Sequence, residues 1–267
     1  MVNNRSLNSD KRVVVIGAGI GGIASALRAR ALGYQVVLTE RLPTVGGRAQ
    51  VFKKNGYLHD AGPTLITAPF LFDELFELFN EKREDHLEFK AINPWYRYYF
   101  HTGETFDYCD SIEATHAEIS RFNPKDVKNY DRLLKFSEAI FDIGFTKLAD
   151  TPFLKLSNMI RQFPNIIRLK GYRTVFKFVS HYLEHPLLRR AFSIHPLLVG
   201  GNPFDTTSIY SLIHFLERKW GVYFCMGGTG KLIKELQNLM LRTGIELELK
   251  TDIDSIEVKD RKVSSIT

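Results

Sequence analysis

Cysteine is scarce in this sequence, whose 267 residues include only Cys109 and Cys225. The two lie 116 positions apart and match no metal-ligand spacing, so nothing indicates a disulfide framework, and a reducing cytosol is the default compartment. Apolar runs are short as well, and none reaches the roughly 18 residues that a membrane-spanning helix needs. The polar first ten residues lack the apolar stretch of a secretory signal. We therefore expect a cytoplasmic chain without a removed leader, for which any membrane contact is peripheral.

The composition is that of a globular protein. Hydrophobic residues make up 44% of the chain, which is enough for a large core, and the length allows one large domain or two smaller ones. Basic residues exceed acidic ones, which gives a formal net charge of +6. This excess is compatible with a nucleic acid, an anionic membrane or an anionic ligand, and the charge alone does not choose among them.

The opening of the chain predicts a strand, a glycine turn, a helix and a second strand. Residues 13–16 are a continuous apolar run, residues 20–31 carry apolar side chains near helical spacing, and residues 35–40 read as the second strand. Gly17, Gly19 and Gly22 form G-x-G-x-x-G after the first strand, and Glu40 lies 18 residues beyond the last glycine. In this context the glycines and helix N-terminus suit a diphosphate and the acid suits a ribose, so we expect a dinucleotide site; a structural glycine turn is the alternative.

The segment after Glu40 separates NAD from FAD, which share this fingerprint. Arg41, Gly46, Gly47 and Arg48 follow within eight positions. An adjacent glycine pair loses much backbone entropy on folding, so it is usually kept where something approaches the backbone closely. A flavin cofactor runs past the end of the second strand, where a glycine-backed segment carrying arginine is useful. The segment therefore favours FAD.

Three stretches resemble one group of flavoproteins. "ERLPTVGGRAQ" resembles the R-x(4)-G-G-R segment of the group that contains amine oxidases, protoporphyrinogen oxidases and carotenoid desaturases, and "GYLHDAGPTLI" resembles the desaturase form of the segment after it. Residues 193–232, which begin "SIHPLLVGGNPFDTTS", are very similar to the matching block of bacterial-type phytoene desaturases. The resemblance extends from Lys11 onward.

This resemblance implies an FAD-dependent enzyme that desaturates phytoene or a related C40 or C30 carotenoid precursor. It implies an α/β fold, in which a Rossmann-like FAD-binding domain of the amine-oxidase type carries an inserted α+β substrate domain. The expected boundaries are 1–86 and 227–267 for the two parts of the FAD-binding domain and 87–226 for the inserted domain. Relatives continue with a late glycine-rich flavin segment, so we expect an N-terminal portion, truncated at its C-terminus, that binds FAD weakly or does not turn over alone.

The resemblance also assigns cofactor contacts. A first group, from the glycine turn, faces the diphosphate, and Glu40 faces the adenosine ribose. A second group, from the segment after Glu40, faces the phosphate and flavin side. The "DAGPT" segment lies near the isoalloxazine ring, and the strand around Ile253 runs beside the adenine. The first group is Gly17, Ala18, Gly19 and Gly22, the second is Arg41, Gly46, Gly47 and Arg48, and the "DAGPT" residues are Gly62, Pro63 and Thr64.

One residue is a catalytic candidate by resemblance. In relatives the segment matching "FLKLSNMIRQFP" can carry an acid and an arginine three positions apart, and this chain has Asn158 and Arg161 there. Desaturation removes a hydride, which a flavin accepts, and a proton, which a cationic environment can help to remove. Asn158 cannot act as a base, so Arg161 is the candidate. The alternative is a helix-face arginine that binds solvent or lipid phosphate.

Acidic residues are absent from residues 151–183, which contain six basic residues interleaved with six aromatic ones. This composition is typical of an interfacial segment on anionic lipid, where a bilayer-dissolved precursor would be met. We expect peripheral association with the cytoplasmic membrane face; the alternative is a solvated helix face with its apolar side in the core. Because no nucleic-acid reader motif is present, no nucleic-acid partner is expected. The oligomeric state is not indicated.

Two short motifs are set aside. His181, Glu184 and His185 spell H-x-x-E-H, but a proline follows at once and no third ligand is evident, so no metal site is expected. The "CMGGTGKL" stretch fails the phosphate-loop pattern, because Cys225 and Leu232 stand where glycine and serine or threonine are needed.

Two other functions on the same scaffold stay open. One is another flavoenzyme such as an amine or protoporphyrinogen oxidase, against which residues 193–232 argue. The other is a non-catalytic carrier of a prenylated partner, as in Rab GDP-dissociation inhibitors, which the intact glycines and Glu40 disfavour. The last predicted strand ends at Thr267 without a closing helix. An unfinished sheet exposes unpaired backbone groups, which also predicts a fragment.

Overall fold

The computed structural model describes residues 11–147, 164, 167–169 and 171–267. The chain divides into two compact units, of which unit 1 is Met1–Lys90 with Tyr223–Thr267 and unit 2 is Ala91–Val222. Unit 1 is therefore built from two segments that are far apart in the sequence, with unit 2 inserted between them. The boundaries expected from the sequence lie after residues 86 and 226, whereas the two units divide after Lys90 and Val222.

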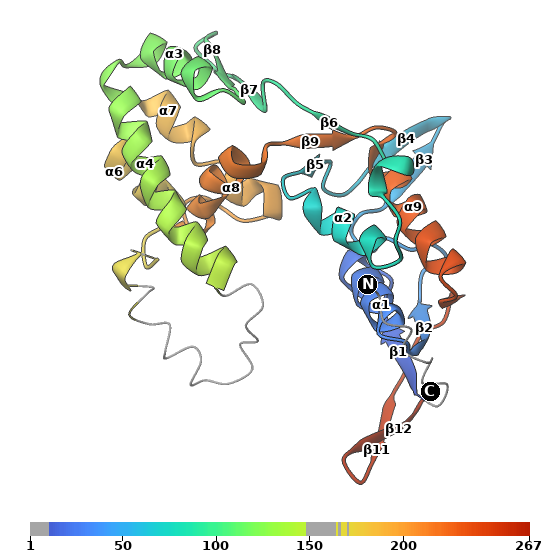
Figure 1. Cartoon of the computed structure of the whole chain (residues 1–267). Helices are drawn as coiled ribbons and strands as arrows, with labels where there is room; N and C mark the ends of the chain where they lie inside the picture. Colours follow the sequence, from blue (N-terminus) through green and yellow to red (C-terminus); the bar gives the residue numbers. More distant parts are fainter. Residues whose placement is uncertain (1–10, 148–163, 165–166, 170) are drawn as a thin grey trace. The chain divides into compact units, whose positions relative to one another are not determined.

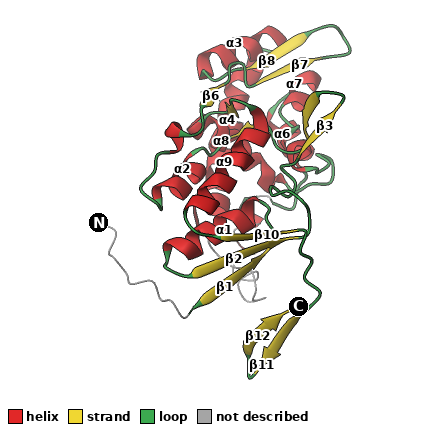
Figure 2. Ribbon diagram, turned by 90° about the vertical axis from the view of Figure 1, so that its right-hand side faces the viewer, coloured by secondary structure: helices red, strands yellow, loops and turns green. Residues whose placement is uncertain are grey.

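A parallel sheet forms the centre of unit 1. Its strands run in the order β1 (Arg12–Ile16), β2 (Gln35–Glu40) and β10 (Glu246–Leu249). Helix α1 (Ile20–Ala31) connects β1 to β2, and α9 (Gly228–Arg242) leads into β10 (Figure 2). This confirms the predicted strand, turn, helix and strand. Five of the six residues of β2 are buried, as in a strand covered on both faces, whereas β1 is only partly buried and Ile16 at its end is exposed.

Unit 1 also contains two antiparallel hairpins, one after β2 and one after β10. β3 (Val51–Lys54) pairs with β4 (Tyr57–Asp60) around Asn55 and Gly56, which have φ angles of 52° and 82° as the predicted type I′ turn requires. β11 (Ile256–Lys259) pairs with β12 (Lys262–Ile266), and this hairpin projects away from the parallel sheet (Figures 1 and 2). Among the described strands, β12 pairs with β11 alone, so the sheet at the end of the chain has two strands.

The remaining elements of unit 1 pack around one apolar core. α2 (Phe70–Glu77) is followed by the short helix η1 (Arg83–Asp85), and β9 (Tyr223–Cys225) lies between β5 (Leu65–Ile66) and β6 (Phe89–Ala91). The core joins α1, β2, α2 and α9 through buried side chains that include Leu27, Leu38, Phe76, Leu236 and Leu239.

Unit 2 is mostly helical, with an aromatic hairpin. α4 (Lys125–Phe141) packs against α8 (Leu212–Trp220) around the fully buried rings of Tyr108, Tyr130 and Phe192. Among the described residues no helix is long and apolar enough to cross a membrane. The other elements are β7 (Tyr96–Tyr99), β8 (Thr105–Tyr108), α3 (Ile112–Phe122), the π-helical turn η2 (Asp142–Lys147), α6 (Val175–Tyr182), α7 (Pro186–Ala191), η3 (His195–Val199) and η4 (Ser208–Ser211).

Candidate dinucleotide-binding site

The glycine turn between β1 and α1 leaves an open face at a helix N-terminus. Gly17 has a φ of +95°, and its N–H donates to the carbonyl of Thr39 at 2.8 Å, which holds the turn against β2. Gly19 is the N-cap of α1, and no acidic residue lies in the first turn of that helix. The first N–H groups of a helix have no partner within it, so this end of α1 can donate to an anion.

The glycines of the turn differ in what a side chain would meet. A Cβ on Gly22 would overlap the carbonyl oxygen of Gly17, so this position serves close packing of helix and turn. A Cβ on Gly17 would meet no described atom within 4 Å, and one on Gly19 would meet only the Cα of Gly47, at 3.9 Å. The face of the turn at Gly17 and Gly19 is therefore the one that a ligand can approach.

The second glycine pair packs directly on the first glycine turn. The N–H of Gly46 donates to the carbonyl of Ala18 at 2.8 Å, and a bridge joins Gly19 to Gly46. A Cβ on Gly47 would lie 2.9 Å from the Cα of Gly19. Both Gly46 and Gly47 have positive φ angles, of 116° and 58°. Sequence reasoning missed this contact: in this structure the partner that approaches the glycine pair is the backbone of the fingerprint itself.

Glu40 lies beside this turn at the end of β2. Its side chain is buried, with 7% exposed; one carboxylate oxygen accepts from the N–H of Ala18 at 2.7 Å and the other from the N–H of Leu42 at 2.9 Å. A carboxylate can accept about four hydrogen bonds, so two bonds leave capacity for ribose hydroxyls. The carbonyl of Glu40 also accepts from the N–H of Thr251, which ties β2 to the chain leaving β10.

The arginines and the "DAGPT" residues border the same glycine segment. Arg41 and Arg48 are both exposed. A Cβ on Gly62 would overlap the carbonyl oxygen of Arg48, so the two segments are in backbone contact. The hydroxyl of Thr229 donates to the carbonyl of Pro63 at 3.1 Å, which anchors this segment to α9. Thr64 follows Pro63 and is exposed.

The start of α9 explains the glycines of "MGGTG". The N–H of Thr229 donates to the carboxylate of Asp60 at 3.2 Å, and a Cβ on Gly228 would lie 2.8 Å from the same carboxylate. Gly227 and Gly228 have φ angles of 91° and 78°, which L side chains rarely adopt. The carboxylate of Asp60 therefore occupies the position at the N-terminus of α9 where an anionic ligand could otherwise bind.

Ile253 does not lie in a strand, contrary to the sequence-based expectation. β10 ends at Leu249 and β11 begins at Ile256, and Ile253 lies in the loop between them with its side chain partly buried. The loop starts beside Glu40, through the hydrogen bond that the N–H of Thr251 donates, and so leaves the sheet at the same end as the glycine turn. The polar and apolar alternation around Ile253 suggests a strand, but aspartate is disfavoured in strands, and Asp252 and Asp254 flank Ile253 directly.

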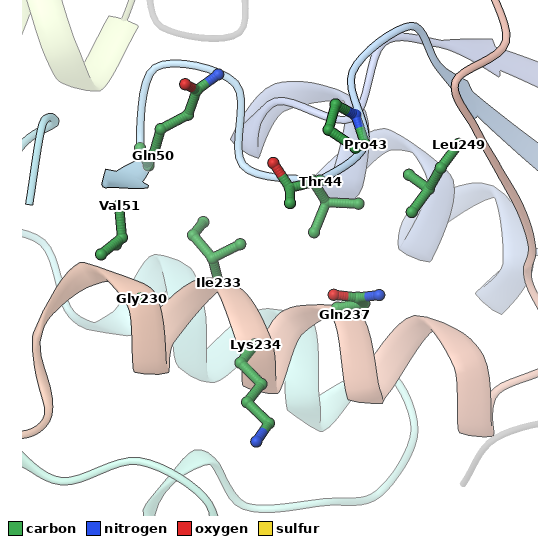
Figure 3. A pocket seen from close by; sticks show the side chains of 11 residues that line it. Pro43, Thr44, Gln50, Val51, Gly230, Ile233, Lys234, Gln237 and Leu249 are labelled. Atoms are coloured by element: carbon green, nitrogen blue, oxygen red, sulfur yellow. The ribbon is translucent and has the colours of Figure 1, made fainter. Parts of the chain in front are cut away.

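A cleft of about 370 Å³ opens next to this site, between residues 43–51 and α9 (Figure 3). Ile233 points from α9 toward the loop, and Lys234 and Gln237 follow on the same helix (Figure 3). None of the three fingerprint glycines and no atom of Glu40 line it, so the cleft is distinct from the glycine turn.

The catalytic candidate Arg161, with Asn158, lies outside the described residues. Two residues of the H-x-x-E-H motif make a structural contact, because the backbone N–H groups of Glu184 and His185 each donate to the buried carboxylate of Asp126 at 2.9 Å. In the part of the chain that the structure describes, no group of three or more His, Cys, Asp or Glu is arranged to hold a metal ion.

Unit 2 contains a buried polar cluster that sequence reasoning did not assemble. Glu217 accepts from the hydroxyl of Tyr96 at 2.6 Å, and its other oxygen lies 3.0 Å from Nε2 of His195. The rings of His195 and His214 are 4.1 Å apart at their centroids, and both nitrogens of His214 lack a hydrogen-bond partner in the described structure. Burial, and then the neighbouring His195 and Arg218, hold the pKa of His214 well below its ordinary value. Burial and the charge of Glu217 raise the pKa of Tyr96.

Comparison with known proteins identifies one family model, described as flavin-containing amine oxidoreductase, which matches residues 20–266. Phytoene desaturases (lycopene-forming) from Pseudescherichia vulneris and Pantoea ananas are 43% and 42% identical over 256 residues. That alignment covers 96% of this chain and 52% of each relative, so the chain spans about half the length of these curated relatives.

Solved structures show the same fold at low sequence identity. Putrescine oxidase bound to putrescine is 16% identical with a TM-score of 0.62, over 94% of this chain and 53% of the oxidase. A Rab GDI from Plasmodium falciparum is 11% identical with a TM-score of 0.55, over 96% of this chain and 62% of that protein. Both likenesses concern the fold alone.

Proposed function

Because the chain belongs to the flavin-containing amine oxidoreductase family, we propose that unit 1 binds FAD, with the diphosphate on the glycine turn between β1 and α1. The observation that carries this proposal is the 2.7 Å hydrogen bond from the N–H of Ala18 to the carboxylate of Glu40. It sets a buried acid beside the N-terminus of α1, so that ribose and diphosphate groups meet the acceptor and the donors that each requires.

The residues present fit this cofactor. Gly17 and Gly19 leave the turn open to a diphosphate, and the first turn of α1 offers N–H donors without a competing acid. The exposed guanidinium groups of Arg41 and Arg48 supply positive charge on the adjoining segment. Gly62 is in backbone contact with that segment, and residues 62–64 are proposed as the next surface along an extended cofactor.

The proposed reaction of the whole protein is dehydrogenation of phytoene or a related C40 or C30 carotenoid precursor. Its support is the curated names of the relatives, which include lycopene-forming phytoene desaturases and, at 30% identity, a 4,4'-diapolycopen-4-al dehydrogenase from Metabacillus indicus. FAD supplies a hydride acceptor when bound. The role of the described residues is to bind and orient the cofactor, and Arg161 stays the proposed aid to proton removal.

A non-catalytic carrier on the same scaffold is the second function to test. The likeness of a Rab GDI structure concerns the fold, which enzymes and carriers share. The glycine turn favours the flavoenzyme, because Gly17 and Gly19 keep one face open where a carrier would need no such opening. An amine or protoporphyrinogen oxidase is disfavoured by the desaturase names of the 43% and 42% identical relatives.

The proposed location is the cytoplasmic face of the cytoplasmic membrane, with peripheral attachment. A carotenoid precursor dissolves in the bilayer, so an enzyme that acts on it has to reach the lipid. The excess of basic residues, a net charge of +6, favours an anionic surface.

Cofactor binding tests the proposal directly. The purified chain is titrated with FAD and, separately, with NAD, with the bound fraction measured by equilibrium dialysis. We expect FAD to bind more tightly than NAD and to give a yellow complex that absorbs at about 450 nm. If neither the 267-residue chain nor a gene product of the relatives' length binds FAD, the proposed function is wrong. A gene product that binds FAD but leaves liposomal phytoene unchanged would instead favour the carrier.

A further inference from the structure

Large apolar side chains are exposed together on unit 2, at the end of η3 and in the loop after it. Leu197, Leu198 and Val199 are 47–59% exposed and Phe204 is 60% exposed. Tyr172, on a segment far away in the sequence, is 68% exposed. Soluble proteins seldom expose adjacent apolar groups in this number without a binding role. We call these five residues the apolar tip.

Backbone hydrogen bonds join the two segments of the apolar tip into one structure. The N–H of Phe176 donates to the carbonyl of Pro203 at 3.0 Å, and the N–H of Ser208 donates to the carbonyl of Arg173 at 2.8 Å. The rings of Phe176 and Phe204 contact each other at a tilt of 45°, with centroids 4.7 Å apart. The tip therefore has a fixed shape, since main-chain bonds hold both of its segments.

Buried residues directly precede the tip in the chain and follow it in α6, so the exposure is confined to the tip. His195 and Pro196 begin the same short helix and are buried, and Val175 and Phe178 of α6 are fully buried. Gly200 ends η3 in the left-handed conformation, and the N–H of Gly201 returns to the carbonyl of Pro196 at 2.7 Å. This turn keeps residues 197–199 pointing away from the core.

Basic residues border the apolar tip, whereas acidic residues are nearly absent. Arg173 follows Tyr172 directly, with its guanidinium 5.9 Å from that ring, and Lys177 is exposed one helical turn later. Residues 171–177 and 196–208 contain one acid, Asp205, whose carboxylate accepts from the amide of Asn202 at 2.7 Å. Apolar groups with a cationic border suit a lipid surface with anionic headgroups.

We propose that the apolar tip is the surface by which unit 2 inserts into an anionic bilayer. This deepens the proposed function, since it rests on a lipid-dissolved substrate. Tyr172, Arg173 and Lys177 belong to the acid-free residues 151–183, whereas residues 197–204 lie outside that stretch. Leu197, Leu198 and Val199 enter the acyl boundary, while Arg173 and Lys177 contact the headgroups.

Vesicle flotation of the whole chain, without FAD or substrate, tests this proposal. We expect binding to phosphatidylglycerol vesicles and much weaker binding to phosphatidylcholine vesicles. The double variant L197S/V199S should lower the partition coefficient at least about tenfold, because each apolar side chain loses its transfer into lipid. The double variant R173Q/K177Q should lower binding to phosphatidylglycerol and weaken its salt dependence.

The matched control is V258S/V263S, which removes two valines of β11 and β12 that are 61% and 67% exposed, close to the 59% and 58% of Leu197 and Val199. It should leave vesicle binding unchanged. Circular dichroism and urea midpoints establish that each variant is folded. Equal binding by L197S/V199S and the control overturns the proposal. So does a lipid-free dimer, detected by sedimentation, that L197S/V199S dissociates, because the tip would then bind a second copy. FAD affinity is measured separately, so a failed lipid test leaves the proposed function standing.

Discussion

Ala18 and Glu40 are joined by a hydrogen bond of 2.7 Å between a backbone N–H and a buried carboxylate oxygen, although 22 positions separate them. The bond places the acid against the turn before α1, and the second oxygen of Glu40 is held by the N–H of Leu42. The orientation of this carboxylate is therefore set by the protein before any ligand arrives.

Replacing this acid should weaken FAD binding. In E40Q the amide group brings N–H donors toward one of the two backbone N–H groups, and the charge that strengthens ribose bonds is lost. We expect the Kd for FAD to rise about tenfold to a hundredfold, which corresponds to the roughly 1.5–3 kcal/mol of a hydrogen bond to a charged group. Equilibrium dialysis measures the Kd for FAD of each variant. E246Q is the control, since Glu246 lies at the start of β10 with its side chain 63% exposed, and an equal loss there would contradict the assignment.

Two neighbouring glycines should respond oppositely to alanine. In G22A the new methyl group overlaps the carbonyl oxygen of Gly17, whose own N–H is bound to Thr39, so neither side can move freely. We expect a loss of more than about 2 kcal/mol in the free energy of unfolding. In G21A the methyl group meets nothing described within 4 Å, and replacing a helical glycine should be neutral or stabilise by up to about 1 kcal/mol. Urea unfolding measures both; similar midpoints for the two variants would show that the packing is not as described.

The stability of unit 2 should fall as the pH is lowered through the range where histidine titrates. The folded state holds the pKa of His214 below the ordinary 6.5, so below about pH 6.5 the unfolded chain binds a proton that the folded chain does not. The stabilisation is thus present above that pH and is lost on acidification, with a slope approaching about 1.4 kcal/mol per pH unit for one proton.

The variant H214L should flatten this acid dependence, because it removes the titrating group. Urea unfolding between about pH 7.5 and 5 gives the slope for each protein. H101Q is the control, since His101 is exposed at the turn between β7 and β8. If H214L keeps the slope of the parent chain, the acid sensitivity has another source.

Patterns in the sequence correctly predicted those elements that are specified by residues close together in the chain. The strand, turn and helix around Gly17, the strand up to Glu40 and the hairpin at Asn55 and Gly56 are each specified by neighbouring residues, and the structure has them. The family and the class of fold were equally accessible, because residues 193–232 carry a long and specific resemblance.

Contacts between distant segments were not accessible in this way. The packing of Gly47 on Gly19 and the capping of α9 by Asp60 join positions that no periodicity links. The cluster around His214 is of the same kind, since Glu217 lies near it in sequence but Tyr96 comes from β7. Only the adjacent pair Gly46 and Gly47 indicated that something approaches the backbone closely, and the pair did not indicate which segment.

Because β10 pairs with β2, the parallel sheet of unit 1 can be completed only late in synthesis. β2 leaves the ribosome early, whereas β10 follows only after all of unit 2 has been translated. Translation proceeds at about 5–20 residues per second, so the edge of β2 stays unpaired for many seconds while the inserted unit has time to fold by itself. During that interval the nascent chain exposes an apolar strand edge, the kind of surface that recruits a chaperone or another unfinished copy.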